Sequence, residues 1–301
     1  MTHVQDGGAV TSTAPATTLK VGWIGLGSQG GPMARVLAGS GVPVQLWARR
    51  PESLTAYDNT PATTSSTSLG LLMENDVVVL VVRDDDDVKD VLFGAWQPQV
   101  MGGFGAKPPI ASMKPGSVVV IHSTVHPDTI REIAAVAHEH GVGVVDAPVS
   151  GGGHAAEDKS LLVMTAGDPD DVAKVKPIFE QYSNLIPYLG PVGAAQSAKI
   201  INNVLLTANM GVAESAFAIA KQVGVDPESL KLVLSNGSGR SFGVTMVGGD
   251  DWDLKPAATV AGPLLQKDTR LLVALAEAEG IDTGAALSAA QSALARMGLD
   301  L

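Results

Sequence analysis

The chain has 301 residues, of which 45% are hydrophobic and 17% are charged, and its formal net charge is −11. This composition is that of a globular protein, and the length predicts about two domains of roughly 150 residues each. The negative charge argues against nucleic acid or an anionic membrane as the main partner. The absence of cysteine excludes disulfides, thiolate metal sites and a cysteine nucleophile, and it favours a cytoplasmic protein.

The N-terminal segment 1–18 is rich in Thr, Ala and Ser, and it has neither a basic start nor an apolar stretch. It is interpreted as a disordered tail and not as a signal peptide. No apolar run approaches the roughly 20 residues that a membrane-spanning helix needs. We therefore expect no membrane partner.

Strands and helices are expected to alternate from residue 19 to residue 192, the first predicted domain. Short apolar runs predict the strands, and the stretches between them predict the helices. The expected strands are 19–26, 42–48, 76–82, 117–121, 143–149, 161–166 and 186–189, and the expected helices include 32–37 and 128–140. This alternation predicts an α/β domain with a parallel sheet covered by helices on both faces.

Two segments of this half have a distinct composition. Four aspartates at 84–87 are most simply a helix start, because carboxylates are stabilised at the positive end of the helix dipole. Residues 94–112 are rich in Gly and Pro and are interpreted as a surface loop. The alternative is a lid near a cofactor, since long loops in compact domains often carry function.

The character of the chain changes after Gly193. Residues 194–223 lack proline and are rich in Ala, Ile, Val and Leu, which predicts one helix longer than the usual range of about 8–20 residues. Further helices are expected at 227–234, 264–279 and 284–297. The second predicted domain, 193–301, is therefore all-helical, and the long helix is expected to join it to the first.

A glycine signature follows the first expected strand and precedes a helix. It reads G-x-G-x-x-G and consists of Gly25, Leu26, Gly27, Ser28, Gln29 and Gly30. The first glycine permits the tight turn, the second lets a pyrophosphate approach the backbone, and the third allows the helix to pack closely on the strand. This context predicts a Rossmann-type dinucleotide site. The alternative is a glycine turn that binds nothing.

The end of the second strand bears on the choice of cofactor. NAD-dependent enzymes tend to place a carboxylate there for the ribose hydroxyls, whereas this chain has Arg49 and Arg50. Two guanidinium groups suit a 2′-phosphate, which favours NADP(H) over NAD(H). The alternative is that both arginines are solvated or that one of them pairs with Glu52.

A second glycine-rich loop, Asp-Ala-Pro-Val-Ser-Gly-Gly-Gly at 146–153, follows another strand. It lies at the carboxyl end of that strand, where α/β proteins bind ligands. The N–H groups of Gly151 and Gly152 can gather around an anion, and Ser150 adds a hydroxyl. The loop is therefore a candidate anion-binding site. A flexible glycine loop remains the alternative.

Lys199 and Asn203 are four residues apart on the long helix, so their side chains share one face. Reduction of a carbonyl by hydride produces an alkoxide that must be protonated. A lysine whose pKa is lowered by burial or by a cationic neighbour suits that role, and Asn203 can hydrogen-bond the same substrate. The alternative is that Lys199 reaches solvent and Asn203 caps a local bend. No H-E-x-x-H or comparable metal constellation is present.

In order along the chain, these motifs resemble those of the β-hydroxyacid dehydrogenases, the family of 3-hydroxyisobutyrate dehydrogenase and tartronate semialdehyde reductase. The resemblance covers nearly everything from Leu19 onward. It rests on the glycine signature with the following Pro-Met-Ala at 25–34, on Ser123, Thr124 and Pro127, on 146–152, on Lys-x-x-Asn-Asn at 199–203, and on Lys267 with Asp268.

The resemblance implies a role for each motif. Ser150 and the adjacent glycine backbone hold the substrate carboxylate, Lys199 is the acid/base, and Asn203 orients the substrate. Lys267 approaches both cofactor and substrate, while Val82 and Thr124 contact the cofactor. The expected reaction interconverts a small β-hydroxyacid and its semialdehyde or keto form, in a homodimer or homotetramer.

Two other functions stay open at this point. An imine reductase shares the architecture, although the retained Lys199 and Ser150 loop argue against it. A non-catalytic NADP-binding interaction module on the same fold is expected to lose the lysine.

The chain departs from the family pattern at several positions. Gln29 stands where Met is usual, His122 replaces the Asp often found before Ser-Thr, and Lys159 stands where Gly is usual. The segment 94–112 is also longer than usual. These changes bear on substrate preference more than on reaction type. His122 and His154 are interpreted as surface or hydrogen-bonded loop histidines.

Overall fold

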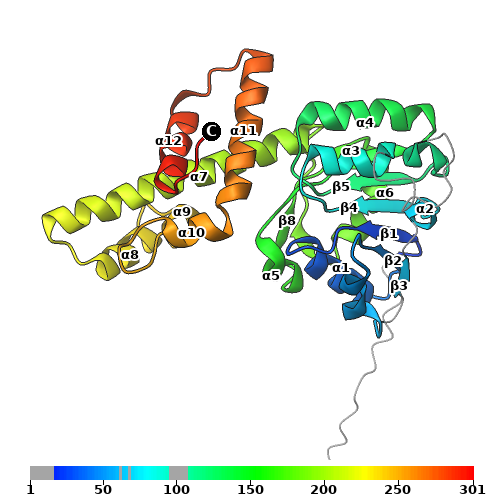
Figure 1. Cartoon of the computed structure of the whole chain (residues 1–301), viewed down its shortest axis with the longest axis horizontal. Helices are drawn as coiled ribbons and strands as arrows, with labels where there is room; N and C mark the ends of the chain where they lie inside the picture. The colour runs from blue at the N-terminus through cyan, green and yellow to red at the C-terminus, as the bar shows by residue number, and fades with distance from the viewer. Residues whose placement is uncertain (1–16, 61–62, 67–68, 95–107) are drawn as a thin grey trace, which may run out of the picture. The chain divides into compact units, whose positions relative to one another are not determined.

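The computed structural model describes residues 17–60, 63–66, 69–94 and 108–301, which form two compact units (Figure 1). Unit 1 consists of the described residues up to Ser123 together with Arg131–Val192. Unit 2 consists of Thr124–Ile130 and Gly193–Leu301. Residues 1–16 of the predicted tail and residues 95–107 of the predicted loop lie outside the described parts.

Unit 1 is built on a seven-stranded sheet in the order β3-β2-β1-β4-β5-β6-β9. The strands are β1 (Val21–Ile24), β2 (Val44–Trp47), β3 (Thr63–Ser66), β4 (Val77–Leu80), β5 (Val118–Ile121), β6 (Gly143–Asp146) and β9 (Ala166–Gly167). Neighbours from β3 to β6 pair in parallel, and β9 pairs antiparallel with β6. The central strands β1, β4 and β5 are buried along their whole length, which is why they consist almost entirely of apolar residues.

The helices of this part of the chain lie on both faces of the sheet. Their bounds are α1 (Gly30–Gly39), η1 (Pro51–Tyr57), α2 (Leu69–Leu72), α3 (Asp85–Phe93), η2 (Pro109–Ser112), α4 (Pro127–Glu139), α5 (Gly152–Glu157) and α6 (Pro169–Phe179). Leu37 of α1 and Ile178 of α6 share one hydrophobic core with Trp23 and Val79 of the sheet. Figure 1 shows α3 and α4 along the opposite face. The predicted Rossmann-type architecture is therefore confirmed.

A smaller three-stranded sheet, in the order β10-β8-β7, completes unit 1. Its strands are β7 (Val149–Ser150), β8 (Leu161–Val163) and β10 (Ser183–Leu185). The sequence predicted one continuous strand at 143–149 and another at 161–166. Pro148 lacks an N–H and interrupts the first of these, so β6 ends at Asp146 and β7 starts at Val149 in a different sheet.

One further predicted strand is in the wrong position, and one strand of the structure was not predicted. The expected strand 186–189 is found earlier, as β10, and only a single parallel bridge links Tyr188 to Thr165. Pro187 contributes only its carbonyl, which accepts from the Thr165 N–H at 2.9 Å, so regular pairing does not extend there. β3 was not predicted, because its sequence, Thr-Thr-Ser-Ser, has no hydrophobic pattern.

The aspartate run begins α3, as predicted. Asp84 is the N-cap and its Oδ1 accepts from the N–H of Asp87 at 3.0 Å. Three acidic residues follow in the first turn, where the exposed N–H groups of the helix favour negative charge.

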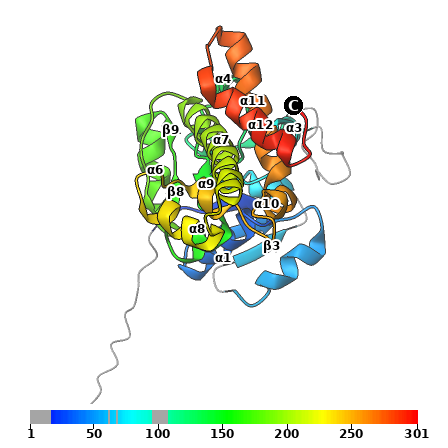
Figure 2. The ribbon, with the colours of Figure 1, turned by 90° about the vertical axis from the view of Figure 1, so that its left-hand side faces the viewer.

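Unit 2 is helical and is centred on α7 (Ala194–Val223), which has the predicted bounds. The other helices are α8 (Pro227–Asn236), α9 (Phe242–Thr245), α10 (Lys255–Val260), α11 (Gly262–Glu279) and α12 (Gly284–Arg296). In Figure 2, where α7 is seen nearly end-on, α11 and α12 lie on one side of it and α8 and α9 on the other. Met210 and Phe217 of α7 share a buried cluster with Val244, Leu265 and Leu294.

By length and composition alone, α7 is also apolar enough to cross a membrane, which corrects the expectation that no such run exists. Half of the relevant window, of mean hydropathy 1.2, is buried inside the protein. The buried face carries Gln196, Lys199 and Asn203 as well as apolar side chains. Packing of α9, α11 and α12 against the helix accounts for the apolar side chains of its buried face.

Candidate active site

The glycine loop has the shape that the three glycines were predicted to give. Gly25 has φ +103°, and a Cβ there would lie 2.2 Å from the carbonyl oxygen of Val81. A Cβ on Gly30 would lie 2.3 Å from the carbonyl oxygen of Gly25. By contrast, a Cβ on Gly27 would meet nothing within 4 Å. The first and third glycines are thus required by packing, while the second leaves open space in front of the start of α1.

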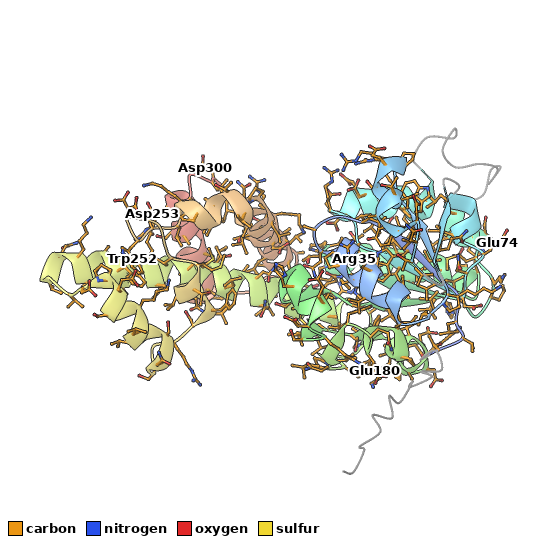
Figure 3. The ribbon with its side chains drawn as sticks, turned by 90° about the horizontal axis from the view of Figure 1, so that it is seen from below. Arg35, Glu74, Glu180, Trp252, Asp253 and Asp300 are labelled. Carbon is orange, nitrogen blue, oxygen red and sulfur yellow. The ribbon has the colours of Figure 1, made fainter. Side chains whose placement is uncertain are left out.

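Arg49 and Arg50 follow β2 and immediately precede η1, and both are exposed. The segment after them is fastened to α1: the hydroxyl of Tyr57 donates to the carbonyl of Gly31 at 3.0 Å. The guanidinium of Arg35, which is labelled in Figure 3, lies 5.7 Å from the centre of the Tyr57 ring. Burial raises the pKa of Tyr57, so its hydroxyl remains a donor. These contacts tie the arginine-bearing turn to the helix that begins at the glycine loop.

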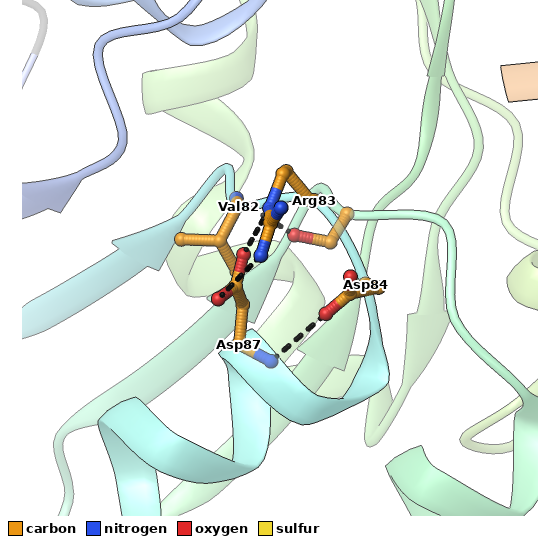
Figure 4. A network of polar contacts seen from close by, with 5 residues as sticks. Val82, Arg83, Asp84 and Asp87 are labelled. Atoms are coloured by element: carbon orange, nitrogen blue, oxygen red, sulfur yellow. Dashed lines mark hydrogen bonds and ion pairs between the residues drawn. The ribbon is translucent and has the colours of Figure 1, made fainter. Parts of the chain in front are cut away.

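The end of β4 carries a third arginine, in the network drawn in Figure 4. Arg83 Nε donates to Asp87 Oδ2 at 2.8 Å, and Arg83 Nη2 donates to Asp87 Oδ1 at 3.3 Å. The Arg83 hydrogen bond holds the pKa of Asp87 below its usual value, and the positive charge of Arg49 acts in the same direction. The neighbouring Val82 N–H donates to the Ser123 hydroxyl at 2.9 Å, which links the ends of β4 and β5.

The second glycine-rich loop lies directly beside the first. Ser150 is on β7, opposite Leu162 of β8, and Gly151 and Gly152 follow with φ +131° and +78°. A Cβ on Gly153 would lie 2.8 Å from the carbonyl oxygen of Ser28, because α5 packs against α1. Unit 1 therefore brings together the two loops that the sequence assigned to the cofactor and to the substrate carboxylate.

The departures from the family pattern have distinct structural outcomes. Lys159 has φ +56°, a left-handed conformation that explains why glycine is the usual residue there. The side chain of His154 is fully exposed and lies 3.7 Å from Glu157. His122 is buried and hydrogen-bonded to Ala147 and Tyr182, so it is a core residue and not a surface histidine.

In unit 2, Lys199 and Asn203 form a buried polar cluster with Asp268 of α11. Asn203 Nδ2 donates to Asp268 Oδ2, and the other carboxylate oxygen, Oδ1, lies 2.8 Å from Lys267 Nζ. Asp268 is completely buried, and within the described part of the chain its Oδ1 accepts no hydrogen bond of good geometry. A buried carboxylate is tolerated only when cations and donors surround it, which Lys267 and Asn203 provide.

Lys267 also reaches the segment that the sequence assigned to the cofactor. Its Nζ donates to the carbonyl oxygen of Thr124 at 2.6 Å. The next residue, Val125, donates its N–H to Gln196 Oε1 at 3.1 Å. These bonds attach 124–130 to unit 2, so Thr124, Lys267 and the Lys199 helix belong to one compact group.

Lys199 is the most perturbed cation of this group. Burial lowers its pKa to about 8; Asp268 opposes that shift, and Lys267 adds to it. Within the described parts of the chain, Lys199 Nζ takes part in no hydrogen bond or ion pair. A lysine in this state changes protonation near neutral pH and has its donor capacity free for a ligand.

Asp268 is a site residue to which the sequence analysis gave no role. It appeared there only as the second member of the Lys-Asp pair. The signal that could have found it is its place on the buried side of α11, since Leu265, Asp268, Leu272 and Leu275 recur at helical spacing and are all buried. A carboxylate at a core position needs a partner, and the cations of the same unit supply it.

Unit 1 fits a nicotinamide dinucleotide by this geometry. The open space at Gly27 admits a pyrophosphate to the backbone at the start of α1, where the positive end of the helix dipole favours an anion. The exposed Arg49 and Arg50 stand at the strand end that binds the adenosine ribose in such folds. The fold and its glycine loop thus define a dinucleotide-binding protein of the Rossmann class.

Comparisons with known proteins define the family. A family model described as the NAD binding domain of 6-phosphogluconate dehydrogenase matches residues 20–190. A second, described as NAD-binding of NADP-dependent 3-hydroxyisobutyrate dehydrogenase, matches residues 193–300. The chain belongs to the β-hydroxyacid dehydrogenase family and is an NAD(P)-dependent oxidoreductase.

Individual relatives agree with this assignment. Mitochondrial 3-hydroxyisobutyrate dehydrogenase of Mus musculus is 31% identical over 78% of this chain and 67% of its own length. The 2-(hydroxymethyl)glutarate dehydrogenase of Eubacterium barkeri is 30% identical over 75% of this chain and 71% of its own. The solved structure of Mycobacterium tuberculosis 3-hydroxyisobutyrate dehydrogenase with L-serine is 26% identical, with a TM-score of 0.74 over 91% of this chain and 92% of that one.

Proposed function

We propose that this enzyme reduces a small semialdehyde or keto acid to its β-hydroxyacid, and catalyses the reverse oxidation, with Lys199 as the proton donor and acceptor. The observation that carries the proposal is the state of Lys199: buried, with a pKa of about 8 and no hydrogen bond or ion pair within the described residues. Such a side chain can give up or accept a proton close to neutral pH.

The chemistry follows from that state. A bound nicotinamide supplies or removes the hydride. In reduction, the carbonyl carbon gains the hydride and its oxygen becomes an alkoxide, which takes a proton from the Lys199 ammonium and leaves the neutral amine. In oxidation, the neutral amine takes the proton of the hydroxyl group. A pKa of about 8 keeps both forms of Lys199 accessible.

Two further groups complete the proposed machinery. The Nδ2 group of Asn203 donates to Asp268, which fixes the orientation of the Asn203 amide. Its Oδ1 accepts from Asn202 Nδ2 at 3.0 Å and is proposed to accept from a substrate hydroxyl instead when substrate is bound. Ser150 and the N–H groups of Gly151 and Gly152 are proposed to bind the substrate carboxylate. The names of the relatives fit a small hydroxyacid as substrate.

For the cofactor we propose a preference for NADP(H) over NAD(H). Arg49 and Arg50 are exposed at the end of β2, where a ribose-binding carboxylate is absent. Replacing Arg49 with Ala removes one charge-assisted contact, so it should weaken NADPH binding by about 1.5–3 kcal/mol and affect NADH much less. Titration of both cofactors with both proteins measures this, and a clear wild-type preference for NADH would contradict it.

The decisive experiment for the reaction is a screen of short semialdehydes and β-hydroxyacids with NADPH and NADH. We expect turnover of a carboxylate substrate and little turnover of the matching uncharged alcohol. Lys199→Met serves as the control for each active compound. Turnover of a cyclic imine without turnover of any semialdehyde would favour an imine reductase, and no turnover at all would favour a binding module.

We further propose that the enzyme is a homo-oligomer that pairs through α7. The residues Ile201, Leu205, Val212, Ile219 and Val223 are 53–68% exposed, and their spacing of 4, 7, 7 and 4 places them on one face of the helix. This face is turned away from Lys199 and Asn203, which lie on the buried side. An apolar stripe of this length fits a second copy of the same helix.

Light scattering on Ile219→Glu tests the assembly, with Gln222→Glu as the control at an exposed polar position of α7. We expect the stripe variant to have a lower mass than wild type and the control to be unchanged. A monomeric wild-type protein would contradict the proposal.

A further inference from the structure

A buried polar network lies beneath the two ligand loops of unit 1, and the proposed reaction does not use it. His122 at the end of β5 is enclosed by Trp23, Phe179 and Tyr182, with ring centres 6.0, 5.5 and 5.9 Å from its own. His122 Nδ1 bonds the carbonyl oxygen of Ala147, and Nε2 lies 3.0 Å from the Tyr182 hydroxyl. The indole N–H of Trp23 donates to the carbonyl of Gly25 at 3.1 Å.

The partners determine the protonation of the network. A carbonyl oxygen can only accept, so Nδ1 of His122 carries the proton and Nε2 accepts from the Tyr182 hydroxyl. Burial lowers the pKa of His122 to about 4 and raises that of Tyr182 well above its usual value. The imidazole is therefore neutral and the phenol protonated throughout the ordinary pH range, and each hydrogen bond has one fixed direction.

The network is connected to both proposed ligand loops, the cofactor loop 25–30 and the substrate loop 146–153. Ala147 is the second residue of the substrate loop and lies three residues before Ser150. Tyr182 immediately precedes β10, which pairs with β8, and β8 pairs with the Ser150 strand β7. On the other side, Gly25 is the first glycine of the cofactor loop, and the residue after His122 is Ser123, which accepts from Val82.

We propose that His122 and Tyr182 are positioning residues that hold the Ala147–Ser150 segment in the conformation that binds the substrate carboxylate. Ala147 and Pro148 leave the large sheet between β6 and β7, so the carbonyl of Ala147 has no strand partner among the described residues and accepts from His122 instead. Tyr182 fixes the orientation of the imidazole that makes this bond. The effect on substrate binding rests on the proposed function, whereas the effect on the loop does not.

The structural test uses the Met164 amide as a reporter, because it donates to the Pro148 carbonyl at 3.0 Å. His122→Leu removes the donor to Ala147, whereas His122→Asn keeps an amide N–H close to the position of Nδ1. Hydrogen exchange at Met164 should accelerate roughly tenfold in the Leu variant, corresponding to one lost hydrogen bond, and stay close to wild type in the Asn variant.

Tyr57→Phe is the matched control for the exchange measurement, since it also removes a bond from a buried tyrosine hydroxyl to a backbone carbonyl in unit 1. We expect it to leave Met164 exchange unchanged, and Tyr182→Phe to accelerate it. Unchanged exchange at Met164 in His122→Leu, or equal acceleration at Val119 in the middle of β5, would overturn the proposal. The latter result would mean general destabilisation of the sheet.

The kinetic test separates this inference from the proposed function. At saturating NADPH, His122→Leu should raise KM for the best carboxylate substrate roughly tenfold with a smaller change in kcat, and His122→Asn should restore most of the loss. Ser150→Ala reports on the anchor itself. If Ser150→Ala raises KM and His122→Leu does not, the positioning role is wrong. If neither raises KM but Met164 exchange responds, the loop is positioned as proposed and the carboxylate anchor is wrong.

Discussion

The glycine loop of unit 1 and the Lys199 cluster of unit 2 are the proposed cofactor site and the proposed acid/base site. They are built from different chemical groups. The loop is formed by backbone atoms. Gly25 and Gly30 are required because a side chain there would collide with neighbouring backbone, and the space in front of Gly27 is open for a ligand. The cluster is made of side chains, with the buried charge of Asp268 held between Asn203 and Lys267. A backbone site is encoded locally, in six consecutive residues, whereas a side-chain cluster depends on residues 69 positions apart, as from Lys199 to Asp268.

This difference predicts how each part fails. Changes in the loop should act on cofactor binding or on packing, and should leave the acid/base chemistry intact. Changes at Lys199, Asn203 or Asp268 should act on the rate and on its pH dependence and should leave cofactor affinity intact, whereas Lys267 is expected to contact the cofactor as well. A loop variant that changes the acid/base chemistry, or a variant of Lys199, Asn203 or Asp268 that changes cofactor affinity, would contradict this distinction.

The largest expected effect is that of Lys199→Met, which keeps the length and apolar stem of the side chain but removes the proton donor. Loss of general acid–base catalysis typically lowers the rate by about 10²–10⁴. The protein should fold and bind NADPH normally, because the glycine loop lies in the other unit. Single-turnover NADPH oxidation at saturating cofactor measures the rate, and Kd is determined separately. Asn203→Ala should be milder, and a wild-type rate for Lys199→Met would mean that the lysine is structural.

Gly27→Ala should act on the cofactor alone. A Cβ at Gly27 has open space, so the melting temperature should not change, but the methyl group would stand where the pyrophosphate approaches. Loss of charge-assisted backbone contacts should raise Kd for NADPH roughly 10–100-fold. Gly30→Ala is the contrasting variant: its Cβ would lie 2.9 Å from Val81 Cβ, so overpacking should lower stability by about 1–3 kcal/mol. Equal effects on Tm would contradict the packing argument.

The parts of the fold that could be predicted are those with strong local patterns. The bounds of α7 follow from a glycine on either side of a long proline-free run, and Asp84 begins α3 because a carboxylate caps the helix. The glycine loop could be predicted because its function depends on backbone geometry, which glycine spacing encodes directly. These features can be recognised in the sequence without knowing which residues pack against them.

The parts that could not be predicted depend on distant contacts. The break between β6 and β7 occurs where Pro148 ends the pairing and Ala147 turns to bond His122, a residue 25 positions away. The role of His122 as a core residue likewise depends on Tyr182. Asp268 was given no role because its burial, and the Asn203 amide that donates to it, depend on the packing of α11 against α7. No local pattern encodes such pairings.

The smallest expected effect sharpens the comparison most, because it tests the electrostatics of the cluster without removing a reacting group. The Asp268 carboxylate raises the pKa of Lys199 against the larger effect of burial, and it also screens Lys267, which lowers that pKa. Asp268→Asn keeps the shape and an oxygen that can accept from Asn203, but it removes the negative charge. The pKa of Lys199 should therefore fall below its wild-type value of about 8.

The sign of the change in activity follows from the protonation state that reduction needs. The ammonium form donates the proton, so kcat for reduction decreases as the pH rises through the pKa of Lys199 in the enzyme–substrate complex. In wild type this decrease is expected near pH 8, and in Asp268→Asn it should occur about one pH unit lower. Asp251→Asn is the matched control, because Asp251 is exposed in the same unit and pairs only with the exposed Lys255 among the described residues. Measuring kcat from about pH 6 to about pH 10, with the melting temperature checked for each variant, decides the matter. An unchanged alkaline limb in a folded Asp268→Asn protein, or an equal shift in Asp251→Asn, would show that the buried carboxylate does not control the proton donor.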